Sequence, residues 1–213
     1  MITQQEYSLI LQKCTEIPPA KGMYLIHDYI ENLLLTVLDF QMHNVAVENA
    51  IAYYRDKRFN EIRTLDDLKR LLSKYADDKE GNTAAAQYLW GNKHWTRVSL
   101  LRKLVAYFES IGIISQEALS QWAEESNFQD DFKGKISGMA YAIYQWLIMR
   151  QGVETVKPDV HLIHFVKSII HHSFTESELV IVLEKVAKEL GLKAYELDWR
   201  IWECESNIQT PLS

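Results

Sequence analysis

Asp159 is a carboxylate placed where a loop turns into a helix. Pro158 comes directly before it, and an apolar helical pattern from His161 to Ile170 follows. Proline fixes its own φ and lacks an N–H, so it suits the loop before a helix or its first turn. Capping this helix is the plainer role for Asp159, since aspartate is a favoured N-cap. An accessible carboxylate can also stabilise developing positive charge and take a proton from water.

A tight turn and an apolar helix precede this carboxylate by about twenty residues. Ser137, Gly138 and Met139 are expected to form the turn, because glycine enters positive φ without steric cost. From Met139 to Arg150 the chain is apolar almost all round. A helix without a polar face is normally buried, so this segment is expected to lie inside the fold.

Composition and charge narrow the class of protein. The chain has 213 residues, 47% hydrophobic and 24% charged, enough for one good-sized domain or two small ones. Its N-terminus lacks the basic region and apolar core of an export signal, and no run approaches the roughly 18 apolar residues of a membrane span. Cys14 and Cys204 are too few for a disulfide framework, so we expect a reduced, cytoplasmic protein. The formal charge of −6 argues against non-specific polyanion binding but allows a local basic patch.

Helical periodicity dominates the rest of the sequence. With 8 Gly and 4 Pro in the whole chain, few breakers interrupt it, and no alternating strand pattern stands out. Thr64 with Asp67, and Thr175 with Glu178, have the spacing of capped helix starts. The pattern therefore predicts an all-α protein.

Two short segments resemble the helix-hairpin-helix DNA glycosylase superfamily, the HhH-GPD group that includes endonuclease III. Residues 136–142, Ile-Ser-Gly-Met-Ala-Tyr-Ala, are similar to the family hairpin, which usually reads like Leu-Pro-Gly-Val-Gly-Arg-Lys-Thr-Ala. Residues 158–161, Pro-Asp-Val-His, are similar to the Val-Asp-Thr-His segment that follows about twenty residues on. If the resemblance holds, Asp159 falls on the family's catalytic aspartate.

Three more segments extend the resemblance in the same order along the chain. Leu38–Ala50 resembles the family's Leu-Ser-x-Gln-x-Thr-Asp segment, with Gln41 at the glutamine and Asn44 where an Asp often occurs. Tyr88–Val105 looks like the Gly-Phe-Tyr-x-x-Lys-Ala segment, and Tyr195–Cys204 resembles the closing helix.

The fold implied by the resemblance is a pair of helical lobes with a cleft between them. Residues 22–150 would form a central helical barrel lobe, with the helix-hairpin-helix near 128–150. Residues 1–21 and 151–213 would form the second lobe.

The resemblance implies a base-excision repair enzyme that acts on duplex DNA with a damaged or mispaired base. Asp159 would stabilise the oxocarbenium-like sugar and orient water as the base departs. The base must leave the stack, which calls for a pocket and a gap-filling side chain. The expected DNA contacts are Gln41, Asn44, Lys135, Gly138 and Ala140, with Gln41 the gap-filler or base-edge contact. Base-pocket candidates are His43, Tyr141 and Trp146, for which core packing is the ordinary alternative.

Departures from the family pattern shape the expected chemistry. Ala142 stands where bifunctional members carry a nucleophilic lysine, so we expect a monofunctional hydrolase without Schiff-base lyase activity. The chain stops shortly after Cys204, so we expect no iron–sulfur cluster. The resemblance alone allows a monovalent cation at the hairpin, and we expect no other cofactor. His161 and His164 lie one helical turn apart but lack acidic or cysteine partners in sequence, so we expect no metal there.

The hairpin itself favours an alternative function. Ala140 replaces the second glycine and Tyr141 the basic residue, and a β-carbon at Ala140 would narrow the approach of a phosphate or conflict with the turn. Lys133, Lys135 and Lys157 could restore positive charge, although solvated surface lysines are the norm. The alternative is a catalytically inactive DNA-binding or protein-interaction module that keeps the fold.

Overall fold

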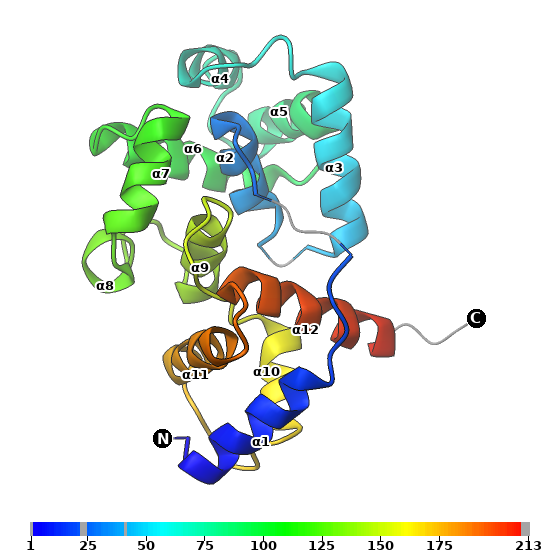
Figure 1. Cartoon of the computed structure of the whole chain (residues 1–213). Helices are drawn as coiled ribbons and strands as arrows, with labels where there is room; N and C mark the ends of the chain where they lie inside the picture. The colour runs from blue at the N-terminus through cyan, green and yellow to red at the C-terminus, as the bar shows by residue number, and fades with distance from the viewer. Residues whose placement is uncertain (1, 22–24, 41, 210–213) are drawn as a thin grey trace. The chain divides into compact units, whose positions relative to one another are not determined.

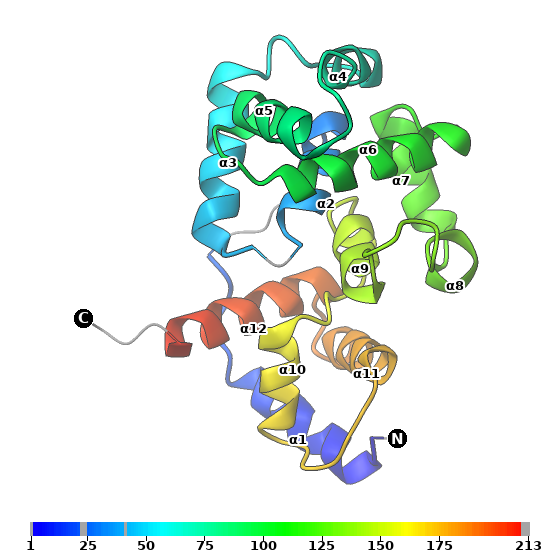
Figure 2. The same cartoon turned by 180° about the vertical axis from the view of Figure 1, so that it is seen from behind.

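The computed structural model describes residues 2–21, 25–40 and 42–209, and it describes side chains up to residue 206. The described residues form twelve α-helices and no strand, so the all-α prediction is confirmed (Figures 1 and 2). In chain order the helices are α1 Gln4–Thr15, α2 Tyr29–Leu38, α3 Asn44–Lys57, α4 Leu65–Leu72, α5 Lys79–Trp90, α6 Trp95–Ser110, α7 Gln116–Glu125, α8 Phe128–Asp131, α9 Tyr141–Met149, α10 Val160–Lys167, α11 Glu176–Glu189 and α12 Ala194–Gln209. None of the described helices is long and apolar enough to cross a bilayer.

The helices divide into two compact units. The terminal unit comprises Met1–Leu25 and Ala140–Ser213, and the central unit comprises Ile26–Met139. This division groups α9 with the chain ends, whereas the sequence placed the boundary at residue 150. The reason lies in the contacts of α9, since Tyr141 packs against the apolar core of the terminal unit and Gln145 bonds to Thr155.

One apolar core holds the terminal unit together. Amphipathic stripes on α1, α10, α11 and α12 converge on it, as expected for helices that each bury one face. Its largest contributors by helix include Ile10, Phe165, Leu183 and Ile201, all almost completely buried. Burial of each such side chain is worth about 1.5–3 kcal/mol, so this core holds α10 against α1, α11 and α12.

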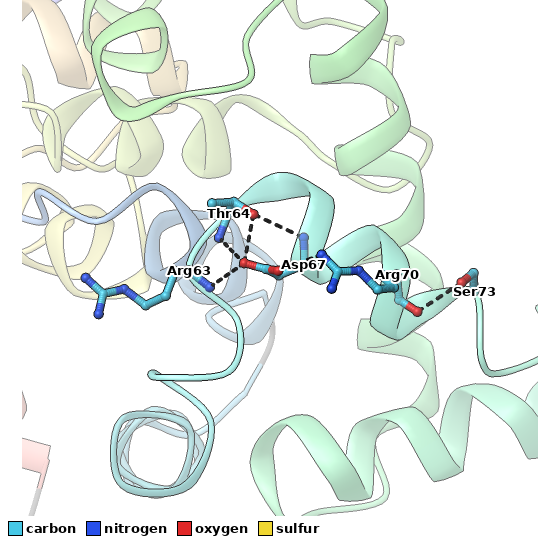
Figure 3. A network of polar contacts seen from close by, with 5 residues as sticks. All are labelled: Arg63, Thr64, Asp67, Arg70 and Ser73. Atoms are coloured by element: carbon cyan, nitrogen blue, oxygen red, sulfur yellow. Dashed lines mark hydrogen bonds and ion pairs between the residues drawn. The ribbon is translucent and has the colours of Figure 1, made fainter.

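The central unit shows why local sequence alone places some helices. At the start of α4 the Thr64 hydroxyl accepts the Asp67 N–H at 3.2 Å, and the Asp67 carboxylate accepts the Thr64 N–H at 3.1 Å (Figure 3). The same carboxylate accepts the Arg63 N–H and pairs with Arg70 one turn later. This capping box satisfies N–H groups that the helix itself leaves open, which confirms the predicted helix start.

Helix boundaries shift by a few residues where caps intervene. The apolar segment expected to be helical from Met139 to Arg150 begins at Tyr141, because Ala140 has an extended backbone with φ −115° and ψ −174°. The helix expected to begin at His161 begins at Val160 and ends at Lys167. The predicted Thr175 capping box of α11 is present.

Candidate functional site

Asp159 is the N-cap of α10. Its Oδ1 accepts hydrogen bonds from the backbone N–H groups of His161 at 2.9 Å and Leu162 at 3.3 Å. The backbone of Asp159 is extended, with φ −90° and ψ −177°, as an N-cap requires. The capping role predicted for this residue is therefore confirmed. Both hydrogen bonds and the positive end of the helix dipole stabilise negative charge on the carboxylate.

Lys157 lies beside this carboxylate. Its Nζ is 3.8 Å from Asp159 Oδ2, and each of the two side chains is 17% exposed. The same ammonium group lies 4.9 Å from the ring centroid of Trp146. The ordinary alternative for Lys157, a solvated surface lysine, is therefore wrong, because the side chain is largely covered and makes an ion pair and a cation–π contact. Lys133 and Lys135, by contrast, are exposed.

A second carboxyl group lies behind the first. Asp198, on α12, is 3% exposed, and its Oδ2 accepts the Lys157 backbone N–H at 2.6 Å. Burial, and secondarily the negative charge of Asp159, raises the pKa of Asp198 to about 8. The neighbourhood of Asp159 thus contains a carboxyl group that holds its proton at neutral pH.

Three half-buried tryptophans form a row next to these groups. The rings of Trp146 and Trp199 are 6.5 Å apart and inclined by 7°, and those of Trp199 and Trp202 are 5.2 Å apart and inclined by 13°. The rings of His161 and Trp202 pack edge to face, with centroids 5.8 Å apart. Trp146 Nε1 and His161 Nδ1 are buried and make no hydrogen bond to the described residues. We call Trp146, Trp199 and Trp202 the tryptophan row.

The sequence could have revealed more of this row than it did. Trp199 and Trp202 are three residues apart, so a helix places them on one face. Trp146, chosen from the sequence as a base-pocket candidate, is connected to Asp159 through Lys157. The Trp146 ring already lies beside two cations, Lys157 and Arg150, each 4.9 Å from its centroid.

Two further candidates in the terminal unit lie at the start of α9. Tyr141 packs against the apolar core, and its hydroxyl accepts a hydrogen bond from Gln145 Nε2 at 2.5 Å. Ala140 is the N-cap of α9 and makes no side-chain cap. Its extended backbone is open to any residue, so the β-carbon does not conflict with this turn.

The remaining candidates belong to the central unit. His43 and Asn44, at the start of α3, are exposed, and His43 caps the helix without a side-chain hydrogen bond. Gly138 has φ +94°, the positive value predicted for it, and Lys135 is exposed. Gln41 lies outside the described residues.

The histidine pair on α10 has separate surroundings. His164 Nδ1 lies 2.5 Å from Glu205 Oε2, while His161 contacts Trp202. Among the described residues, no group of three or more His, Cys, Asp or Glu side chains could hold a metal ion.

The fold defined by these helices is endonuclease III-like. A solved structure described as a trapped endonuclease III–DNA covalent intermediate in an estranged-adenine complex matches with a TM-score of 0.63, over 100% of this chain and 92% of that one. Sequence identity is 16%, so the likeness concerns the fold. The chain belongs to the family described as Domain of unknown function (DUF8548), whose model matches residues 9–206. Among curated proteins, none matches the sequence.

Proposed function

We propose that this protein is a monofunctional DNA glycosylase that hydrolyses the N-glycosidic bond of a damaged or mispaired base. The observation that carries the proposal is Asp159. It occupies the helix start that the family motif assigns to the catalytic aspartate, its carboxylate faces a cation, and the fold is endonuclease III-like.

The proposed reaction uses the two oxygens of Asp159 differently. Oδ1 is committed to the backbone of α10, which holds the group in place. Oδ2 would face the sugar as the C1′–N bond breaks and its electron pair leaves with the base. The carboxylate stabilises the oxocarbenium-like sugar, and water adds to C1′ while its proton passes to the carboxylate. The departing base takes up a proton from solvent, and Asp159 releases the proton that it took from water back to solvent.

The proposed absence of lyase activity rests on Ala142. A methyl side chain there cannot form the Schiff base that a lysine would form. Trp146 would then contribute to the base pocket, with Lys157 moving aside from its ring or contacting the extruded base.

DNA is the proposed partner, and the start of α9 is the proposed phosphate contact. No side chain caps this helix, so its first backbone N–H groups remain suited to a phosphate oxygen. Gly138 supplies the positive φ of the preceding turn, and Lys135 supplies charge. A monovalent cation at this hairpin is implied by the family resemblance alone.

We expect no iron–sulfur cluster within these 213 residues. Such clusters take four cysteine thiolates, and the sequence contains two cysteines. Cys14 is buried in the core of the terminal unit, and Cys204 packs against the same core.

Excision assays test the proposal. Duplexes with uracil, alkylated purines or mismatches are incubated with the native protein and with Asp159→Asn. Excision of at least one lesion by the native protein, and its loss in the variant, are expected. Equal activity of the two proteins would reject the role of Asp159.

Borohydride should trap no covalent complex between the protein and DNA. If it does, Lys157 is the first amine to substitute, because its Nζ lies 3.8 Å from Asp159.

An inactive DNA-binding or protein-interaction module remains the second candidate. The observation in its favour is that Asp159 is 17% exposed and already serves as a cap. The chain's formal charge of −6 points the same way. This candidate predicts no excision of any lesion and, if DNA binds, unchanged affinity in Asp159→Asn.

A further inference from the structure

We propose that Asp198 is the positioning residue of the Asp159 site, because its carboxyl group fixes the backbone that leads into Asp159. The inference deepens the proposed function and rests on it for the catalytic consequence. The placement of the loop itself can be tested without any activity.

The geometry assigns this role through one short hydrogen bond. Asp198 Oδ2 accepts the Lys157 N–H at 2.6 Å, across 41 positions of sequence. Lys157 and Asp159 are two residues apart, and the Asp159 N–H donates to the Lys157 carbonyl at 2.7 Å. A shift of the Lys157 peptide would therefore move the Asp159 backbone. The bond ties α12 to the start of α10 at the residue where the candidate reacting group begins.

The same bond also places a cation. With its N–H held by Asp198, Lys157 directs its ammonium group to the space between Trp146 and Asp159 Oδ2. One buried side chain on α12 thus determines both the position of the carboxylate and that of its counter-charge.

The carboxyl group of Asp198 makes this hydrogen bond at an electrostatic cost. Asp198 is almost completely buried, and the charged groups that act on it are Asp159, which disfavours its ionised form, and Lys157, which favours it. Burial is the larger effect and raises the pKa of Asp198 to about 8. A neutral amide could make the same bond to the Lys157 N–H without this cost, so we expect Asp198→Asn to keep the loop in place.

Two variants separate the hydrogen bond from the charge. Asp198→Asn keeps an oxygen that can accept the Lys157 N–H, while Asp198→Ala removes it. Hydrogen exchange of the Lys157 amide is measured near neutral pH in both variants and the native protein, with global stability measured in parallel. We expect protection in the native and Asn proteins and exchange faster by about tenfold or more in the Ala protein. Equal protection in the Ala and native proteins would overturn the proposal, as would equal loss in both variants.

An NMR titration that follows the carboxyl carbon of Asp198 adds a second test. If Asp198 served only to pack against its neighbours, Asp159→Asn would not change the midpoint of this titration. The Asp198 midpoint should lie near pH 8 in the native protein and fall in Asp159→Asn, since the neighbouring negative charge is removed. An Asp198 midpoint that is unaltered by Asp159→Asn would contradict the coupling. Because neither measurement uses DNA, both decide the role of Asp198 even if the native protein excises nothing.

The catalytic consequence is tested last. With a lesion that the native protein excises, Asp198→Ala should slow single-turnover excision by roughly 10- to 100-fold through misplacement of Asp159. Asp198→Asn should restore most of the rate. Excision by the Ala variant at the native rate would overturn the proposed positioning role.

Discussion

Two buried acidic side chains, Glu31 in the central unit and Asp198 in the terminal unit, have different surroundings. In the central unit, the buried Glu31 carboxylate receives two nitrogens of Arg55, one of them, Nε, at 3.1 Å. Arg102 donates to Asn82 Oδ1 at 2.9 Å and to two backbone carbonyl groups near the end of α4. In the terminal unit, Asp198 is buried with another carboxylate nearby.

The surroundings of Glu31 favour folding, whereas those of Asp198 carry a cost in folding free energy. Pairing a buried charge with opposite charge or with backbone acceptors offsets its desolvation. Burying a carboxyl group near a second carboxylate costs free energy at neutral pH, because the group must stay protonated. Such costs concentrate at functional sites, so the contrast between Glu31 and Asp198 directs attention to the neighbourhood of Asp159.

The largest expected effect is the pH dependence contributed by Asp198. The unfolded group titrates near 3.9 and the folded group has a pKa of about 8. As pH rises between these values the unfolded state releases a proton that the folded state keeps, so the free energy of unfolding falls across this range. Asp198→Asn should remove this decline relative to the native protein, as measured by chemical denaturation from pH 4 to 8. If the free energy of unfolding depended on pH in the same way for both proteins, the proposed cost of burying Asp198 would be wrong.

The matched arrangement in the central unit predicts a smaller loss. Arg102→Met removes three part-buried hydrogen bonds and leaves their acceptors without this donor, at a cost of about 3 kcal/mol. Arg70→Met is the control, because the Arg70 side chain is 70% exposed and its pair with Asp67 should matter little. Urea unfolding of both variants gives the comparison. Similar losses for the two arginines would show that burial is not what gives Arg102 its importance.

Capping predicts a smaller effect again. Thr64→Ala removes the hydroxyl from the α4 capping box and should cost about 1 kcal/mol, whereas Thr64→Ser should retain most of the stability. Unfolding midpoints measure the difference.

By the same principle Asp159→Asn keeps a good cap on α10, so it should leave stability nearly unchanged while it lowers the proposed excision rate. A large stability loss in Asp159→Asn would contradict the expectation that asparagine caps α10 as well as aspartate does.

The smallest expected effect concerns a partly exposed ion pair in the terminal unit. His172 Nε2 lies 3.0 Å from Glu6 Oε1, and the pKa of His172 is raised first by the Ser173 carbonyl and then by Glu6. A raised histidine pKa adds stability below the unfolded value of about 6.5 that is lost at higher pH. His172→Gln should therefore differ slightly from the native protein at pH 5.5 and not at pH 8. High salt should reduce the difference at pH 5.5, since the His172 side chain is 43% exposed.

Local patterns in the sequence predicted some parts of the molecule well. The capping boxes at Thr64 and Thr175, the positive φ of Gly138 and the capping role of Asp159 each depend on a few neighbouring residues. The same dependence explains why the all-α fold could be predicted. Helix periodicity and caps are local signals that can be recognised before the packing of the helices is known.

The surroundings of Asp159 could not be predicted in this way. Lys157 resembles any surface lysine until the fold places Trp146 under its ammonium group. Asp198 gives no sequence signal, because its hydrogen bond to Lys157 spans 41 positions. Trp199 shares a helix face with Trp202, but its stacking on Trp146 depends on packing between α9 and α12. The surroundings of Asp159 therefore depend on packing between residues far apart in the sequence, which local patterns do not reveal.

The most direct test of the account is single-turnover excision with enzyme in excess, comparing Asp159→Asn with Asp78→Asn. Asp78 is a matched control, since it caps α5 in the central unit by accepting the Gly81 N–H at 2.7 Å. We predict that Asp159→Asn slows excision by about 100-fold or more, with DNA affinity retained, while Asp78→Asn stays close to the native rate. Native-rate excision by Asp159→Asn, or an equal loss in both variants, would contradict the account.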